Sequence, residues 1–202
     1  DVYAGYLAKK IGLPINKFVV ATNQNDILHR AITNGSYNVE NVLETISPSM
    51  DIQIASNFER LIFDLNDHSD KKTIDVMKGI KEKGKYEIQK GSLDKINVNF
   101  LSSRMNENEV LNTIKTVYEK FDKTLDPHSA IGYGAFDKVN LKGNNIVLST
   151  AHPCKFPSAI EKAINIKAQL PDELLFILDE KENYDIIDNN IDKVKQHIKE
   201  RI

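Results

Sequence analysis

The chain has 202 residues, of which 41% are hydrophobic and 28% are charged. This is the composition of an ordinary globular protein, and the length suffices for one sizeable core or two small ones. The formal net charge of -2 argues against a nucleic-acid partner, because nucleic-acid binding needs a concentrated excess of Lys and Arg. No stretch approaches the roughly 18 continuous apolar residues of a membrane span. The single cysteine, Cys154, excludes an internal disulfide and fits a reducing, cytoplasmic location.

Predicted helices and strands alternate along the chain. Short apolar runs rich in β-branched residues predict strands, and apolar residues at helical spacing, such as Val110, Ile114 and Val117, predict helices. In chain order we expect a helix over 2–11, a strand over 17–22, a helix from Asp26 on, helices over 52–65 and 69–83, a strand over 96–102, a helix over 106–122, a strand over 144–150, a helix after Pro157, a strand over 173–178 and a helix over 187–200.

The alternation of strands and helices indicates the fold class. Such strands pair in parallel through right-handed crossovers, so the sequence predicts an α/β fold with a doubly wound, mostly parallel sheet flanked by helices. We expect a single domain over residues 1–202, with a peripheral insertion over 66–105, the region that holds the most charged stretch. The segment "DPHSAIG" indicates a further helix start, with Asp126 as its cap and Pro127 in its first turn.

Two segments are candidates for a ligand site, because ligands bind such sheets beyond the carboxyl ends of the strands. They are "VVATNQND" (19–26) and "IVLSTAHPCKFPSA" (146–159). In each, an apolar strand ends in small polar residues before a helix begins, so that hydroxyls, amides and free N–H groups could hold a ligand or an anion. The same residue types are common in turns and caps, and Asp26 is expected to cap its helix. Chemistry alone leaves both interpretations open.

Five motifs in order resemble the second half of the threonine synthase family. They are "YAGYLAKKIGLP", "VVATNQNDILHR", "SPSMDIQIASNFERL", "LDPHSAIGYGA" and "VLSTAHPCKFPSA". These enzymes use pyridoxal phosphate (PLP) and have the tryptophan-synthase-β type of fold, so the resemblance implies a truncated large domain of a fold-type II PLP enzyme. It also implies the conversion of O-phosphohomoserine and water to threonine and phosphate. The resemblance is weakest over 66–105 and beyond residue 170.

The resemblance assigns provisional roles to polar residues of the two candidate segments. Thr150 matches the hydroxyl that meets the pyridine nitrogen of the cofactor in this fold, and Ser149 is its rival because a register shift of one residue would exchange them. A hydroxyl cannot protonate that nitrogen as a carboxylate would, which keeps the ring a milder electron sink. The expected substrate or pocket contacts are Asn23, Asn25, His152 and Lys155, of which Lys155 would meet the substrate phosphate as a point charge.

The resemblance also indicates what the sequence lacks. The cofactor-binding lysine of the family lies in a Phe-Lys-Asp setting, which does not occur here, and the loop that holds the cofactor phosphate should precede Asp1. Because the chemistry needs that lysine, we expect no catalytic residue in this chain and no PLP binding or activity by the chain alone. We therefore expect part of a longer enzyme, with possible self-association through the exposed cleft.

Three other classes of protein are weighed. Another fold-type II PLP lyase, such as a threonine dehydratase, would share the α/β pattern, although "NQNDILHR" and "SPSMDIQIASNFER" favour the synthase. A noncatalytic α/β binding module is the second alternative, since the expected lysine is missing. A metal enzyme is disfavoured because the five histidines are scattered, with no pair at the spacing of a helical metal motif.

Overall fold

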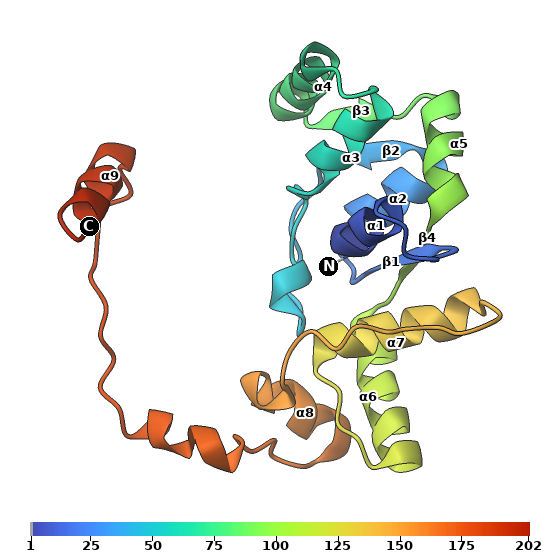
Figure 1. Ribbon diagram of the computed structural model, residues 1–202. Helices are drawn as coiled ribbons and strands as arrows, with labels where there is room; N and C mark the ends of the chain where they lie inside the picture. Colours follow the sequence, from blue (N-terminus) through green and yellow to red (C-terminus); the bar gives the residue numbers. More distant parts are fainter. Residues whose placement is uncertain (1) are drawn as a thin grey trace. The chain divides into compact units, whose positions relative to one another are not determined.

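The computed structural model describes residues 2–202 (Figure 1), and the chain divides into two compact units, one that ends at Ala168 and one that begins at Gln169. The first unit holds both sheets and most of the helices. The second unit holds a 3-10 helix, η3 (Asp172–Leu178), and the helix α9 (Ile191–Lys199). The expectation of a single domain over the whole chain stays a prediction.

The centre of the first unit is a parallel pair of strands. Strand β1 (Phe18–Thr22) pairs with β4 (Phe100–Arg104) in a register that runs from Phe18 opposite Phe100 to Thr22 opposite Arg104. Helices lie between these strands in the chain, so the predicted α/β class with parallel pairing is confirmed. Within residues 2–202 this sheet has two strands, and a separate antiparallel pair is formed by β2 (Ser36–Asn38) and β3 (Lys85–Glu87).

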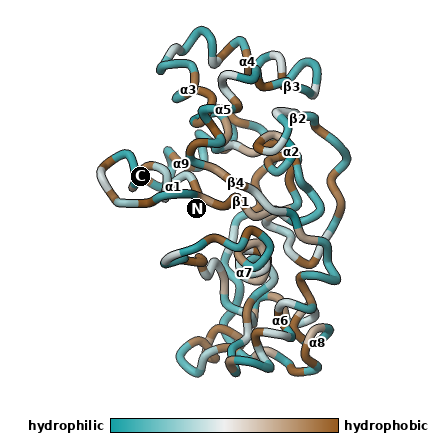
Figure 2. The backbone as a smooth tube through the Cα atoms, turned by 90° about the vertical axis from the view of Figure 1, so that its right-hand side faces the viewer, coloured by the Kyte–Doolittle hydropathy of each residue, from teal (hydrophilic) through white to brown (hydrophobic). Residues whose placement is uncertain are grey.

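Helices cover the parallel pair. Helices α1 (Val2–Lys10) and α2 (Ile27–Asn34) contact β1, while α7 (Pro127–Val139) contacts both strands from the opposite side (Figure 1). Figure 2 shows hydrophobic residues along β1 and β4, the two strands that these helices contact. The other helices of this unit are α3 (Phe58–Leu65), α4 (Asp70–Lys83), α5 (Lys90–Asn99), α6 (Glu107–Phe121) and α8 (Pro157–Ile164).

Two hydrophobic clusters form the core of the first unit. The larger one joins Phe18, Val20 and Phe100 of the parallel strands to apolar residues of α1 to α5. The smaller one joins Met105 and residues of α6, α7 and α8, with Ile114, Ile131 and Ile160 fully buried. Burial at Val110, Ile114 and Val117 confirms the predicted inner face of α6, whereas Phe121 at its end is exposed.

Helix α7 packs unusually close to its neighbours because of its glycines. A Cβ added at Gly134 would come within 2.4 Å of the Met105 side chain, and one at Gly132 would come within 3.3 Å of Val147. The predicted cap of this helix is confirmed, since the Asp126 carboxylate accepts hydrogen bonds from the backbone N–H groups of His128 and Ser129. The Asp126 side chain therefore fixes where α7 begins.

Several predicted elements differ from the structure. The predicted strand over 96–102 begins only at Phe100, because Leu93, Ile96 and Phe100 have helical spacing and pack on the larger cluster. The predicted helix over 52–65 begins only at Phe58, and the chain before it forms a short 3-10 helix, η1 (Pro48–Met50). Residues 66–105 stay a predicted insertion, but their last part is β4, which lies in the core.

The predicted strands over 144–150 and 173–178 are wrong for this chain. Residues 144–150 run without regular structure, with Ile146 88% exposed, and 173–178 lie within the exposed 3-10 helix η3. A buried strand needs hydrogen-bonding neighbours. Within residues 2–202 neither segment has such a neighbour.

Candidate active site

The polar segment that follows β1 is folded inward. Asn23 and Asn25 are each 2% exposed, and their amides fix the turn formed by Ser47–Asp51, called here the 47–51 turn. The Asn23 side-chain amide donates to the Ser47 hydroxyl at 3.0 Å and to the Asp51 carboxylate at 2.7 Å. Its carbonyl oxygen accepts the backbone N–H of Asn25 at 2.8 Å.

Asn25 extends the same network to the chain before the turn. Its amide donates to the Leu43 carbonyl at 2.8 Å and to the Asp51 carboxylate at 3.0 Å, and its oxygen accepts the Leu43 N–H at 2.8 Å. Asp51 also accepts the backbone N–H and the hydroxyl of Thr45. Both asparagines thus have partners inside this chain for their side-chain donors. A direct contact of either with substrate stays a prediction, and the geometry supports a role in shaping the site.

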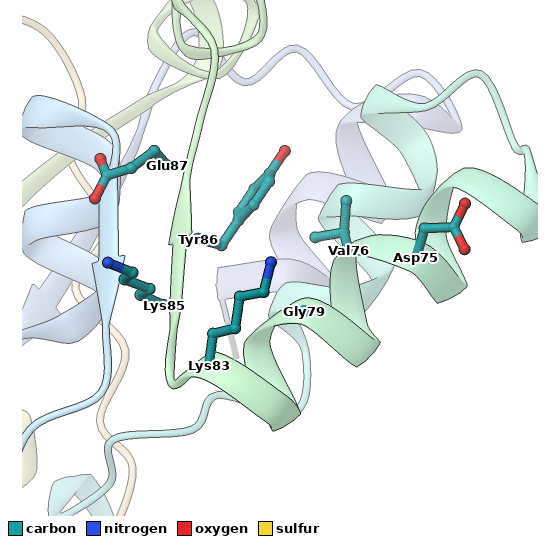
Figure 3. Close-up of a pocket in the computed structure, with 7 residues that line it drawn as sticks. All are labelled: Asp75, Val76, Gly79, Lys83, Lys85, Tyr86 and Glu87. Atoms are coloured by element: carbon teal, nitrogen blue, oxygen red, sulfur yellow. The ribbon is translucent and has the colours of Figure 1, made fainter.

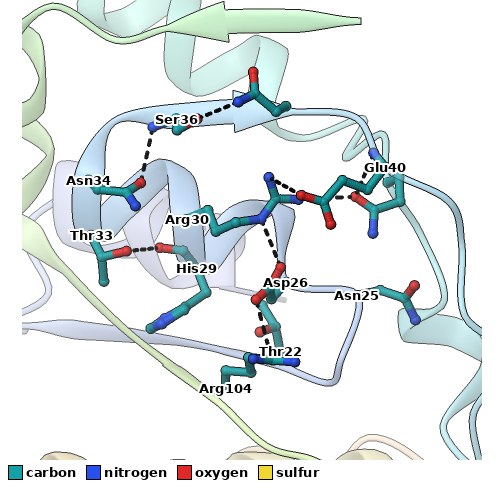
Figure 4. A network of polar contacts seen from close by, with 12 residues as sticks. Thr22, Asn25, Asp26, His29, Arg30, Thr33, Asn34, Ser36, Glu40 and Arg104 are labelled. Atoms are coloured by element: carbon teal, nitrogen blue, oxygen red, sulfur yellow. Dashed lines mark hydrogen bonds and ion pairs between the residues drawn. The ribbon is translucent and has the colours of Figure 1, made fainter.

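Asp26 is not a side-chain cap of α2, contrary to expectation. Its carboxylate accepts no capping hydrogen bond and instead pairs with Arg30 at 2.8 Å and Arg104 at 3.3 Å (Figure 4). The Arg30 guanidinium also pairs with the Glu40 carboxylate at 3.1 Å. Burial lowers the pKa of His29, whose ring is hydrogen-bonded to the Ser102 hydroxyl at 2.8 Å. These pairs tie α2 to the end of β4.

A second network lies at the start of α7 and is called here the α7 cap cluster: Asp126, His128 and Ser129. These residues are 1%, 6% and 2% exposed. The Asp126 carboxylate accepts from the His128 ring at 2.9 Å and from the Ser129 hydroxyl. His128 also packs against the Phe156 ring, with 4.7 Å between the centroids. The sequence identified the helix start but gave no sign that its three polar side chains bond to one another.

The α7 cap cluster joins the two segments that the sequence singled out. The other nitrogen of the His128 ring accepts the backbone N–H of Ser49, in the 47–51 turn, at 3.3 Å. The Ser129 hydroxyl accepts the backbone N–H of Thr150 at 2.9 Å. Because Asn23 bonds to Ser47 and Asp51 of the same turn, the end of β1 is connected through the 47–51 turn and the α7 cap cluster to Thr150.

The predicted residues after position 148 lie at the surface of this chain. Ser149, Thr150, His152 and Lys155 are exposed, and Cys154 is half-buried. The His152 ring accepts the N–H of Cys154 at 3.2 Å and so caps the short 3-10 helix η2 (Pro153–Lys155). Thr150 has its backbone anchored by Ser129, whereas within the described residues Ser149 forms no hydrogen bond.

Thr150 is suited to meet a group supplied from outside this chain. Its hydroxyl forms no hydrogen bond within residues 2–202, although its backbone is held by a buried side chain. A free hydroxyl on an anchored backbone is the donor that a pyridine nitrogen needs, because it can donate one hydrogen bond without carrying charge. The Thr150 hydroxyl is thus free to donate to such a nitrogen, and its contact with PLP stays a prediction.

A pocket in another part of the surface lies away from both candidate segments. It has a volume of about 460 Å³, is open to solvent, and lies between α4 and β3, with Lys83, Lys85 and Glu87 on its wall (Figure 3). It contains no residue of either candidate segment. Among the described residues no cluster of His, Cys, Asp or Glu could hold a metal ion. No helix between residues 2 and 202 is long and apolar enough to cross a membrane.

The fold is similar to that of solved PLP enzymes. A crystal structure of PLP-bound threonine synthase from Brucella melitensis has a TM-score of 0.88 and 39% identity, covering 99% of this chain and 43% of that one. The structure of threonine synthase from yeast has a TM-score of 0.84 and 36% identity, covering 99% and 45%. The chain thus has the architecture of part of a fold-type II PLP enzyme, as the resemblance of its motifs implies.

Sequence comparison agrees over the whole length. The family model "Threonine synthase, C-terminal" matches residues 129–198. Threonine synthase from Pseudomonas aeruginosa is 37% identical over 98% of this chain and 43% of its own length, and that from Saccharomyces cerevisiae is 36% identical over 100% and 45%. The chain belongs to the threonine synthase family. It spans less than half the length of these relatives.

Proposed function

We propose that this chain is the C-terminal part of a threonine synthase, which converts O-phosphohomoserine and water to threonine and phosphate with PLP. The observation that carries the proposal is Thr150, whose hydroxyl is free and whose backbone is anchored by Ser129. Similarity to threonine synthases along the whole chain supports the same conclusion. The small-molecule substrate and the cytoplasmic location belong to this proposal.

In the proposed enzyme Thr150 holds the ring end of the cofactor. PLP, when bound, supplies an electron sink for the carbon chemistry. The Thr150 hydroxyl would donate a hydrogen bond to the pyridine nitrogen without protonating it, which suits elimination and replacement beyond the α-carbon. Ser149 is the alternative donor, and its lack of a backbone anchor within the described residues favours Thr150.

Lys155 and His152 are the proposed contacts of the substrate, because of their charge or polarity and their place on the loop after Thr150. The Lys155 ammonium is exposed and can attract the substrate phosphate as a point charge. His152 lies on the same loop, also exposed, with one ring nitrogen occupied by the Cys154 N–H. Asn23 and Asn25 act by holding the 47–51 turn at the mouth of the site. The PLP-binding lysine is supplied by a part of the enzyme outside this chain.

The activity is tested in a chimera in which this chain follows the preceding part of the Pseudomonas aeruginosa threonine synthase. We expect phosphate release and threonine formation from O-phosphohomoserine, and neither from the 202-residue chain alone. Deamination of threonine in place of this reaction would identify another PLP lyase of the same fold. A folded chimera that binds PLP and turns over neither substrate would favour the noncatalytic binding module.

The cofactor contact is tested by Thr150→Val in the same chimera. Valine keeps the shape of threonine but leaves the pyridine nitrogen without a donor, a loss of about 1 to 3 kcal/mol at a buried site. The rate should therefore fall by about 5- to 150-fold, together with the affinity for PLP. Ser149→Ala is the matched control and should leave both unchanged. The reverse pattern would mean that Ser149 is the donor, and no effect of either variant would refute the contact.

A further inference from the structure

We propose that the α7 cap cluster, Asp126, His128 and Ser129, is a positioning device that sets the backbone of Thr150 relative to the 47–51 turn. This inference rests on the proposed function, because it assigns to the cluster the placement of the cofactor-facing hydroxyl. The cluster lies between the two candidate segments and bonds to both. It acts on the reaction through Thr150 and touches no reacting atom itself.

The directions of the hydrogen bonds are fixed by the backbone groups at the two ends. At one end, the Ser49 N–H can only donate, so Nε2 of His128 is the acceptor and carries no hydrogen. The ring hydrogen therefore lies on Nδ1 and donates to Asp126. At the other end, the Thr150 N–H donates to the Ser129 oxygen, and the Ser129 hydroxyl donates to Asp126. Both lines of donors converge on one carboxylate.

The buried carboxylate makes this arrangement rigid. Asp126 is 1% exposed and accepts from two backbone N–H groups, one ring N–H and one hydroxyl. A buried charge requires such a full set of donors. Rotation of Ser129 or His128 would remove a donor from the carboxylate and would also release Thr150 or Ser49. The turn and the cofactor-facing backbone are thereby held by one shared group.

The same geometry excludes a nucleophilic role for Ser129. In a Ser-His-Asp nucleophile the serine hydroxyl donates to the histidine, which acts as its base. Here the hydroxyl donates to Asp126, and the histidine nitrogen that would act as base is occupied by the Ser49 N–H. All three side chains are also buried. The cluster therefore orients other residues and does not attack a substrate.

The first test measures amide hydrogen exchange at Thr150 in the 202-residue chain. Ser129→Ala removes the acceptor of the Thr150 N–H, so exchange at Thr150 should accelerate by about 2- to 12-fold, the equivalent of one ordinary hydrogen bond. Ser129→Thr restores a hydroxyl and should restore protection. The Val20 amide in β1 reports on global unfolding, so the acceleration at Thr150 should exceed any change at Val20. Unchanged exchange at Thr150 in Ser129→Ala, with Val20 also unchanged, would overturn the proposal.

The second test separates this inference from the proposed function. In the chimera, Ser129→Ala should weaken PLP binding by about 2- to 12-fold, with a smaller effect on the KM for O-phosphohomoserine, and Ser129→Thr should reverse it. If Thr150→Val weakens PLP binding and Ser129→Ala does not, the positioning role is refuted and the proposed function stands. If neither variant changes PLP binding, the cofactor contact of Thr150 is refuted, and the positioning role falls with it.

A pair of His128 variants tests the two halves of the device. Asparagine presents its amide near the place of Nδ1, so His128→Asn keeps a donor to Asp126 and loses the acceptor of the Ser49 N–H. Glutamine reaches the place of Nε2, so His128→Gln does the reverse. We expect His128→Gln to release Thr150, measured by its amide exchange, more than His128→Asn does. Equal protection at Thr150 in both variants would contradict the shared role of the carboxylate.

Discussion

Replacing Asn25 by alanine should destabilise the fold, because this side chain holds the chain before the 47–51 turn. The variant loses hydrogen bonds to the Leu43 carbonyl, to the Leu43 N–H and to the Asp51 carboxylate. Each ordinary hydrogen bond contributes about 0.5 to 1.5 kcal/mol, so their sum is about 1.5 to 4.5 kcal/mol. Leu43 is half exposed and can regain water, so we expect a loss of about 2 kcal/mol in the free energy of unfolding.

Urea unfolding of the 202-residue chain, followed by circular dichroism, measures this loss. Asn145→Ala is the matched control, because Asn145 also donates two hydrogen bonds but lies on an exposed loop; its effect should stay within about 0.5 kcal/mol. A free energy of unfolding that is equal in Asn25→Ala and the parent chain would refute the reasoning. Asn25 would then be available for a ligand, as the sequence suggested.

Three further predictions concern helix packing and the surface. The Lys138 ammonium, 2.8 Å from the Glu109 carboxylate, holds the pKa of Glu109 below its usual range. Glu109→Gln should therefore lower the free energy of unfolding at neutral pH by less than about 1 kcal/mol, because the pair is exposed. Unfolding measured as a function of pH should show this loss vanish as the pH falls below about 4, where Glu109 becomes protonated. Gly134→Ala should destabilise the fold by about 1 to 3 kcal/mol in thermal unfolding, because the added Cβ clashes with the Met105 side chain. Gly79→Ala is the control: its Cβ has no atom within 4 Å, and alanine favours the helix, so this variant should stabilise the fold by up to about 1 kcal/mol. The exposed apolar side chains of Ile146, Val147 and Leu148, which follow α7, should promote self-association. A chain that stays monomeric at high concentration in analytical ultracentrifugation would contradict this prediction.

Local pattern was sufficient where an element carries its own signals. The helical spacing of Val110, Ile114 and Val117 predicted α6, and Asp126 before Pro127 predicted the start of α7. The apolar run before Asn23 predicted β1. These elements form within the chain because capping, spacing and burial all favour the same local structure.

Pattern failed where the outcome depends on a partner. The apolar segments 144–150 and 173–178 read as buried strands in the sequence, but strands need neighbours, and within the described residues neither has one. The segment over 96–102 has strand-like alternation in its first residues, but Leu93, Ile96 and Phe100 also have helical spacing. Ile96 packs on the larger cluster from within the helix α5, so the first part of the segment is helical.

The sequence by itself determined the fold class, the family and the two segments at which a site was expected, because these depend on composition, spacing and motif order. Only the tertiary structure decided that the amides of Asn23 and Asn25 turn inward, that Asp26 pairs with arginines, and that Ser129 anchors Thr150. These contacts join residues far apart in the chain: 21 positions for Ser129 with Thr150, 28 for Asn23 with Asp51 and 78 for Asp26 with Arg104. A side-chain amide or hydroxyl can form a hydrogen bond within a turn, at a helix cap or to a ligand. Which of these bonds forms depends on which buried polar groups would otherwise have no hydrogen-bond partner, and that is known only once the chain is folded.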